Sequence, residues 1–192
     1  MKTVKFNSVN EIIIKNSRFI TLLIKVYDDT DINKIFTEVK LKYPKATHYC
    51  YAYITKSFKK ASDDGEPGGT AGMPMLNVLD KEEMINTLAI TIRYFGGIKL
   101  GAGGLVRAYS KSVRDAIVAS EILNVEEGYL VRVVAAYDEQ KNLDYILKKY
   151  DILSKEYLNT ITYEVLLPKG DLDILNNYSY HILKEEYIEK VL

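Results

Sequence analysis

The chain has 192 residues, 47% of them hydrophobic, and its 26 basic residues balance 26 acidic ones, so its formal charge is zero. A soluble chain of this length can bury a core in one large domain or two small ones. The single cysteine excludes an internal disulfide and favours a cytoplasmic protein. No segment approaches the roughly 18 uninterrupted apolar residues of a membrane-spanning helix, and we expect neither a secretory signal nor a membrane partner.

The first half of the chain alternates strand and helix patterns. Runs rich in Ile, Val, Leu and Phe indicate strands, and Asn16-Ser17 between the first two suits a hairpin turn. Apolar residues at helical spacing follow, with acidic cap candidates at 29–31 and Pro44 as a stop. Residues 55–74 have no period and read as a long loop. The patterns predict strands at 11–15, 19–27, 48–54 and 88–95, and helices from 32 towards Pro44 and from 101 to about 120.

The last third of the chain has the order βαββαβ, which is the split pattern of ferredoxin-like domains. Its predicted strands are 129–137, 152–157, 160–167 and 180–191, with helices at 139–150 and 171–178. A boundary near 126–128 gives an N-terminal α/β domain at 1–126 and a ferredoxin-like domain at 127–192. The predicted fold class is therefore α+β with two domains.

Nine of the eleven glycines lie between Gly65 and Gly104, in the segments DDGEPGGTAG (63–72) and RYFGGIKLGAGGLVRAYS (93–110). The second segment has the succession strand, glycine loop, helix. Glycines let backbone amides approach a ligand, and the first amides of a helix attract anions. A phosphate or carboxylate could bind at 103–105, although neither the P-loop nor the Rossmann spacing is met.

Basic residues gather in the same segment, because residues 93–114 contain five cations and no acid. The helical period puts Leu105, Tyr109, Val113, Ala116 and Ile117 on one stripe and three of the cations on another side. A basic face of this kind is either ordinary solvated surface or a site for anions. The five cations are Arg93, Lys99, Arg107, Lys111 and Arg114.

The first glycine-rich segment carries three acids, Asp63, Asp64 and Glu66. One of them could pair with Arg93, which follows a buried-looking strand and needs an anionic partner. The same carboxylates could hold a divalent cation, but the EF-hand spacing is absent and the sequence equally suits tight turns. Thr70 could act as a nucleophile only beside a base.

Four further side chains have candidate roles. His48 and Cys50 share one face of a strand, and a zinc site would need two more ligands although only His181 remains. We therefore expect a packed cysteine and a hydrogen-bonded histidine. Tyr94 and Tyr109 flank the basic loop and are candidates for stacking on unpaired bases.

Both glycine-rich segments, together with ATHYCYAY (46–53) and NSRF (16–19), closely resemble the signature of the IMPACT/YigZ family. The resemblance implies an N-terminal domain similar to the second domain of a small-subunit ribosomal protein. It also implies a C-terminal domain similar to one in elongation factor G. For eukaryotic members it implies regulation of translation, through ribosomes and an activator of an amino-acid-starvation kinase. No catalytic residues are established for the family, so we expect no catalysis, cofactor or metal.

The leading hypothesis from the sequence is a translation-associated regulatory protein that contacts RNA or the ribosome, without reading DNA sequence. The alternatives are a metal-dependent enzyme acting on a small phosphorylated or carboxylated metabolite, and a protein-interaction module. The predicted anion or RNA site consists of Arg93, Lys99, Gly101, Gly103, Gly104, Arg107, Lys111 and Arg114. The predicted motif loop beside it consists of Asp63, Asp64, Gly65, Glu66, Pro67, Gly68, Gly69 and Thr70.

Overall fold

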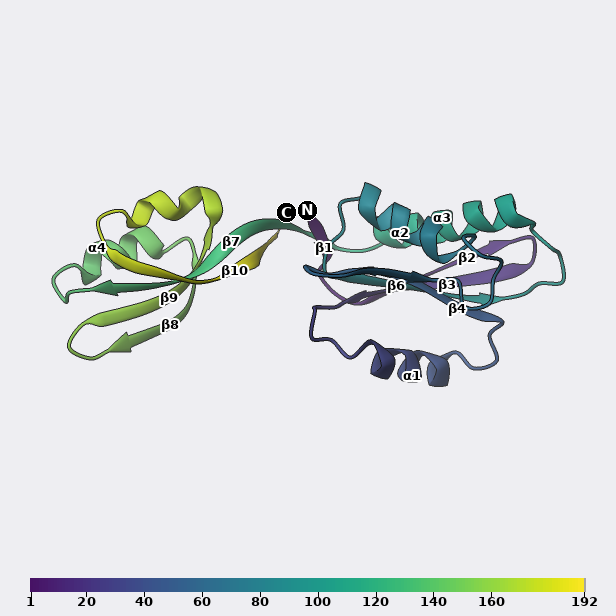
Figure 1. Cartoon of the computed structure of the whole chain (residues 1–192), viewed down its shortest axis with the longest axis horizontal. Helices are drawn as coiled ribbons and strands as arrows, with labels where there is room; N and C mark the ends of the chain where they lie inside the picture. The colour runs from purple at the N-terminus through teal and green to yellow at the C-terminus, as the bar shows by residue number, and fades with distance from the viewer. Residues whose placement is uncertain (192) are drawn as a thin grey trace. The chain divides into compact units, whose positions relative to one another are not determined.

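The computed structural model describes residues 1–191, which form two compact units (Figure 1). The first unit comprises residues 1–124 with Val191, and the second comprises residues 125–190. Each unit contains a β-sheet and helices, so the fold is α+β with two domains. None of the helices within the described residues is long and apolar enough to cross a membrane.

The first unit is a three-layer arrangement around an antiparallel five-stranded sheet of order β2-β3-β6-β4-β5. Helix α1 covers one face of this sheet, and helices α2 and α3 cover the other (Figure 1). The strands are β2 (Ser8–Ile14), β3 (Ser17–Lys25), β4 (His48–Ile54), β5 (Lys59–Ser62) and β6 (Thr87–Tyr94). The helices are α1 (Ile32–Lys42), α2 (Gly72–Lys81) and α3 (Ala102–Val118).

Strict alternation along the strands decides which side chains reach the candidate site. Ile90 and Ile92 of β6 join Val39 of α1 in one apolar cluster. Successive side chains of a strand point to opposite faces, so Thr91 and Arg93 face α2 and α3 instead. The polar side chains of β3 and β6 on this face bond to α3, as in the buried series Thr91–Thr21–Ser112, with oxygen separations of 2.9 and 2.5 Å.

Several predicted elements of the first unit are confirmed and others need correction. Asp31 caps α1 as expected, because its carboxylate accepts hydrogen bonds from the amides of Asn33 and Lys34. The β2–β3 turn lies one residue earlier than predicted, at Lys15 and Asn16, which both have positive φ. The prediction of a loop over 55–74 is wrong in part, since it contains β5 and the start of α2.

Helix α2 and strand β1 (Lys2–Val4) are absent from the sequence-based prediction. Six of the ten α2 residues are buried, so the helix has no wide polar face to give a clear period. Strand β1 is only three residues long and pairs with residues 122–124 at the start of β7, a contact that local sequence cannot reveal.

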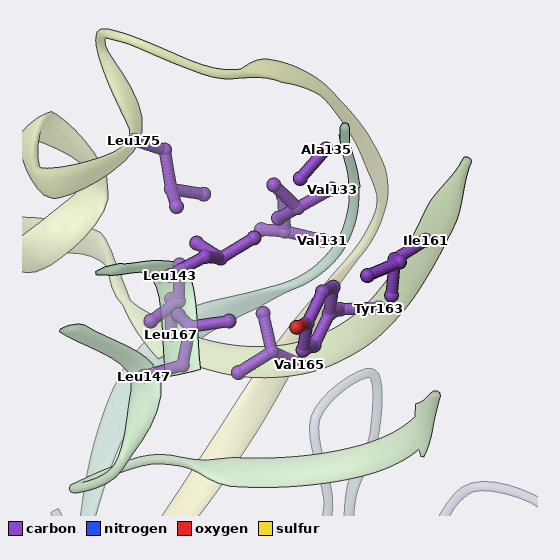
Figure 2. Close-up of a cluster of buried hydrophobic side chains, with 10 residues drawn as sticks. All are labelled: Val131, Val133, Ala135, Leu143, Leu147, Ile161, Tyr163, Val165, Leu167 and Leu175. Atoms are coloured by element: carbon purple, nitrogen blue, oxygen red, sulfur yellow. The ribbon is translucent and has the colours of Figure 1, made fainter. Parts of the chain in front are cut away.

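The second unit has the ferredoxin-like succession βαββαβ, with sheet order β10-β7-β9-β8. Figure 2 shows its core, in which Leu143 and Leu147 of α4 pack on the inward side chains of β7 and β9. The predicted last helix is a 3₁₀ helix, and residues 126–128 lie within a strand. The elements are β7 (Ile122–Ala135), α4 (Gln140–Leu147), β8 (Asp151–Tyr157), β9 (Ile161–Pro168), η1 (Lys169–Leu175) and β10 (Ser179–Val191).

Two glycines of the second glycine-rich segment should respond oppositely to a methyl group. A Cβ on Gly96 would lie 2.1 Å from the carbonyl carbon of Asn16, whereas one on Gly103 would meet only Arg107 Nη1, at 3.9 Å. We expect Gly96→Ala to lower the free energy of unfolding by about 1–3 kcal/mol. Gly103→Ala, in a helix, should raise it by about 0.5–1 kcal/mol. Urea denaturation of both variants measures this, and equal effects would contradict the packing described.

Candidate anion-binding site

The two glycine-rich segments meet at a pocket of about 360 Å³ in the first unit. The first segment contributes Glu66 and Pro67, and β4 and the residue before it contribute His48 and Thr47. The second segment contributes the end of β6, the glycine loop and the start of α3. Its lining residues are Arg93, Phe95, Lys99, Leu100, Gly101, Ala102 and Leu105.

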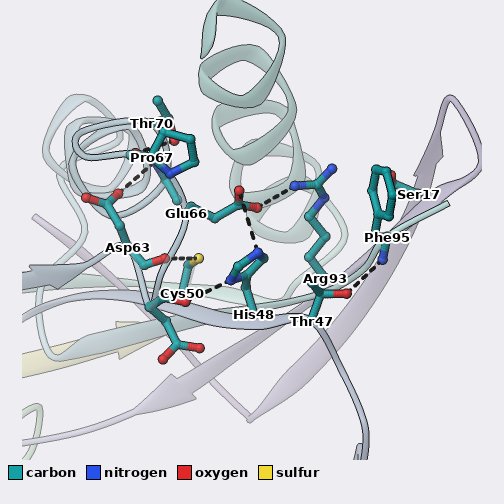
Figure 3. A network of polar contacts seen from close by, with 12 residues as sticks. Ser17, Thr47, His48, Cys50, Asp63, Glu66, Pro67, Thr70, Arg93 and Phe95 are labelled. Carbon is teal, nitrogen blue, oxygen red and sulfur yellow. Dashed lines mark hydrogen bonds and ion pairs between the residues drawn. The ribbon is translucent and has the colours of Figure 1, made fainter. Parts of the chain in front are cut away.

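Glu66 lines this pocket and joins three elements, and Figure 3 shows its contacts with Arg93 and His48. Its side chain is 3% exposed, and Oε1 accepts hydrogen bonds from Arg93 Nη1 at 2.6 Å and Tyr109 Oη at 2.7 Å. Oε2 lies 3.8 Å from His48 Nε2. Of the three acids that the sequence offers as partners for Arg93, the structure selects Glu66. A buried carboxylate and guanidinium are tolerated together because each neutralises the other.

Arg93 is buried between two aromatic rings and keeps an unused donor. The residue is 5% exposed, and Cζ lies 5.5 Å from the ring centroids of Phe19 and of Phe95. Its Nη1 bonds to Glu66, but Nε is buried without a hydrogen-bond partner in the described part of the chain. A buried donor without a partner costs about 1–3 kcal/mol. Arg93 is thus a buried arginine with an acidic partner from the first segment, as the sequence suggests, and it also lines the pocket.

Asp63 and Asp64 serve as acceptors for the backbone. Asp63 Oδ1 accepts from the amides of Ala71 and Gly72, at 2.9 and 2.8 Å, and Oδ2 accepts from Gly69 at 2.8 Å. Burial alone would raise the pKa of Asp63, but these amide bonds lower it below the usual aspartate value. Asp64 Oδ2 accepts from the amide of Tyr49 at 2.6 Å.

The remaining motif-loop side chain with a candidate reaction is Thr70, whose hydroxyl donates to the Pro67 carbonyl at 2.6 Å. The described residues contain no group of three His, Cys, Asp or Glu side chains that could hold a metal ion. Each of the three carboxylates of this segment already accepts a hydrogen bond from another group of the protein. Their role in the structure is therefore to stabilise the fold.

His48 and Cys50 behave as the sequence predicts. His48 Nδ1 lies 2.8 Å from the Asp64 carbonyl, which can only accept, so Nδ1 carries the proton and Nε2 faces Glu66. The Cys50 thiol donates to the Asp63 carbonyl at 2.9 Å and lies 3.3 Å from Tyr109 Oη. Burial raises the pKa of Cys50 to about 12.

The stacking role considered for Tyr109 is wrong. Its side chain is fully buried, packs edge-on against Phe19 and donates to Glu66. Tyr94 is partly buried on the opposite face of β6, with its hydroxyl bonded to the Pro44 carbonyl. The aromatic side chain at the pocket is Phe95, 47% exposed, which the sequence analysis did not single out.

The start of α3 is open. Gly101 precedes the helix with φ of 71° and no side chain caps its first amides. The first turn contains no acidic residue, and Gly103 has no neighbouring backbone that a Cβ would strike. The amides at a helix start carry partial positive charge, so this end of α3 favours an anion.

The cations predicted for the basic face divide into two groups. Lys99, Arg107 and Arg114 are exposed and form no ion pair with any residue between 1 and 191. Lys111 is also exposed but lies 2.6 Å from Asp115, one helical turn away. The apolar stripe predicted for α3 is confirmed, since its buried side chains include Leu105, Tyr109, Val113, Ala116 and Ile117.

Comparison with known proteins agrees with the motifs that form this site. Residues 15–117 match the family model described as the Impact N-terminal domain. The chain is 38% identical over 184 residues to "IMPACT family member YvyE" of Bacillus subtilis, covering 92% of this chain and 83% of that protein. The chain belongs to the IMPACT family. Within this family it is 44% identical over 110 residues to YigZ of Escherichia coli, covering 54% of this chain and 53% of YigZ.

The fold is also similar to that of a solved structure described as a hypothetical protein. That structure shares 27% identity and a TM-score of 0.61, covering 95% of this chain and 97% of its own. The succession of two units described here is thus similar over nearly the whole chain.

The environment of Cys50 predicts an inert thiol. Burial holds its pKa near 12, so at pH 8 almost none of it is the reactive thiolate. We expect no reaction with a disulfide reagent such as DTNB at pH 8 in the native protein, and one equivalent in 8 M urea, because the chain has one cysteine. Stoichiometric reaction within seconds under native conditions would contradict the burial described.

Proposed function

We propose that this protein is a translation-associated regulatory binding protein of the cytoplasm, which contacts RNA or the ribosome and catalyses no reaction. Membership of the IMPACT family supports the association with translation. The chemistry of the α3 surface supports RNA as the partner.

The observation that carries this proposal is the set of unpaired cations on the glycine loop and along α3, together with the uncapped start of this helix. Lys99, Arg107 and Arg114 form no ion pair with residues 1–191, although acids balance bases over the whole chain. A cation that already pairs with a carboxylate must give up that contact to bind a phosphate, so its net contribution to the binding free energy is small. Unpaired cations therefore contribute most of the binding to an RNA backbone. Lys111, paired with Asp115, should contribute less.

The amides of Gly103 and Gly104 can assist the side chains. Arg107 Nη1 lies near Gly103, so a phosphate at the helix start would have both a guanidinium and backbone donors within one turn. Contacts of this kind position a backbone and do not read its sequence. Metal-dependent catalysis through the acids of the first segment is less supported, because protein groups already occupy them.

The test is the salt dependence of binding to a labelled RNA hairpin and to purified ribosomes. Three phosphate contacts predict roughly a 20- to 40-fold loss of affinity between 50 and 200 mM KCl. Replacing Lys99, Arg107 or Arg114 by Ala should weaken binding and lower the logarithmic salt slope by about 1 each.

The matched controls are Lys34→Ala and Lys40→Ala on α1, which lies on the opposite face of the sheet (Figure 1). These variants remove the same charge and should leave binding unchanged. Equal losses in both groups, or no binding at 50 mM KCl, would overturn the proposal. Partners that co-purify after RNase treatment would instead indicate a protein-interaction module.

A further inference from the structure

The pocket beside α3 has two chemically different sides. Arg93 and the first residues of α3 form a side with hydrogen-bond donors. Pro67, Leu100 and Leu105 with the ring of Phe95 form an apolar side. A ligand that fits both needs an anionic or acceptor-rich part joined to a flat or apolar part.

One hydrogen-bond donor on the donor side of the pocket, Nε of Arg93, has no partner among the described residues of the protein. The Arg93 side chain is 6% exposed. Figure 3 shows its guanidinium between Glu66 and Phe95. Arginine has five N–H donors in a fixed plane, and the hydrogen bond from Arg93 to Glu66 uses Nη1. Arg93 also lines the pocket, so a ligand acceptor bound there can meet its guanidinium.

Phe95 is both accessible and held in place, as a stacking surface must be. Its residue is 47% exposed, and its amide donates to Thr47 Oγ1 at 3.0 Å. The guanidinium of Arg93 lies against the same ring. Stacking of an unpaired base on an aromatic side chain is a common mode of single-strand recognition.

Size and surroundings favour one nucleotide of a polymer. A volume of about 360 Å³ is small for a ligand pocket and too small for a duplex. Lys99 and Arg107 lie at and beyond the pocket, where the neighbouring phosphates of a strand would pass. A free mononucleotide carries one phosphate group and would engage fewer of these cations than a strand.

We propose that this pocket binds one unpaired nucleotide of single-stranded RNA, with the base against Phe95 and a phosphate at the start of α3. The inference rests on the proposed function and makes it more specific, because it separates single strands from duplexes. Glu66 and Arg93 position the pocket, and Phe95 contacts the base.

The test uses a fluorescent residue placed in the pocket. The chain contains no tryptophan, so Phe95→Trp introduces a single indole. An rU8 single strand should quench this indole, while a blunt eight-base-pair duplex at equal concentration should not. Phe58→Trp is the matched control, since Phe58 is 55% exposed and does not line the pocket, and it should respond to neither RNA.

Affinity gives an independent readout. Phe95→Ala should weaken rU8 binding about 5- to 150-fold, the usual contribution of one stacked base, and leave duplex binding unchanged. Phe58→Ala should change neither. Phe95→Ala should keep the native far-UV circular dichroism spectrum because this side chain is half exposed, and this excludes misfolding as the cause.

The outcomes separate this inference from the proposed function. Salt-sensitive binding that depends on Arg107 but leaves Phe95→Trp unquenched would overturn the nucleotide pocket and retain the RNA-binding function. Quenching by UMP without any RNA binding would overturn the RNA partner and assign the pocket to a free nucleotide. Equal quenching by single strand and duplex would overturn the selectivity for unpaired bases.

Discussion

The buried ion pair between Glu66 and Arg93 holds the candidate site together. This ion pair links the segment 63–72 to β6, and both of its residues line the pocket. Glu66 also accepts from Tyr109 of α3 and faces His48 of β4, so one carboxylate fixes three elements. Buried ion pairs often add little net stability, because desolvation offsets their attraction. The value of this one lies in the position that it gives to Arg93.

The high density of glycine has three physical reasons, one of which is the positive φ of Gly65, Gly69, Gly97 and Gly101. At Gly72 and Gly96 the backbone of another segment lies so close that a Cβ would sit 2.7 and 2.1 Å from it. These glycines allow packing. At Gly101 and Gly103 no protein backbone approaches, and Gly103 lowers the stability of a helix without any internal need. Such open positions leave room for a ligand to reach the main chain, and they lie beside the unpaired cations.

Local pattern predicted the parts of the structure that depend on period and caps. The acidic cap of α1, the apolar stripe of α3 and the shared face of His48 and Cys50 in β4 all follow from side-chain spacing. The sequence also offered the three acids of one loop as partners for Arg93, and Glu66 is the one that pairs with it. The same period placed Tyr109 on the buried stripe, and this signal was sufficient to exclude it from stacking.

What the sequence could not give depends on contacts between distant residues. Helix α2 is buried on most sides and shows no period, and β1 pairs with a strand almost 120 residues away. Phe95 could have been found, because it stands two residues after Arg93 and follows the end of the strand. The open Nε of Arg93 could not, since it depends on the geometry with which Glu66 approaches from another loop.

The most direct measurement of the central interaction is a double-mutant cycle on Glu66→Gln and Arg93→Met, read from urea unfolding at pH 7. Each single variant should cost about 3–5 kcal/mol, because it leaves the other group buried without its partner. The double variant should cost less than the sum of the two, by roughly 1–3 kcal/mol. Costs that add to within about 0.5 kcal/mol would show that the two side chains act independently, and that the pair does not organise the site.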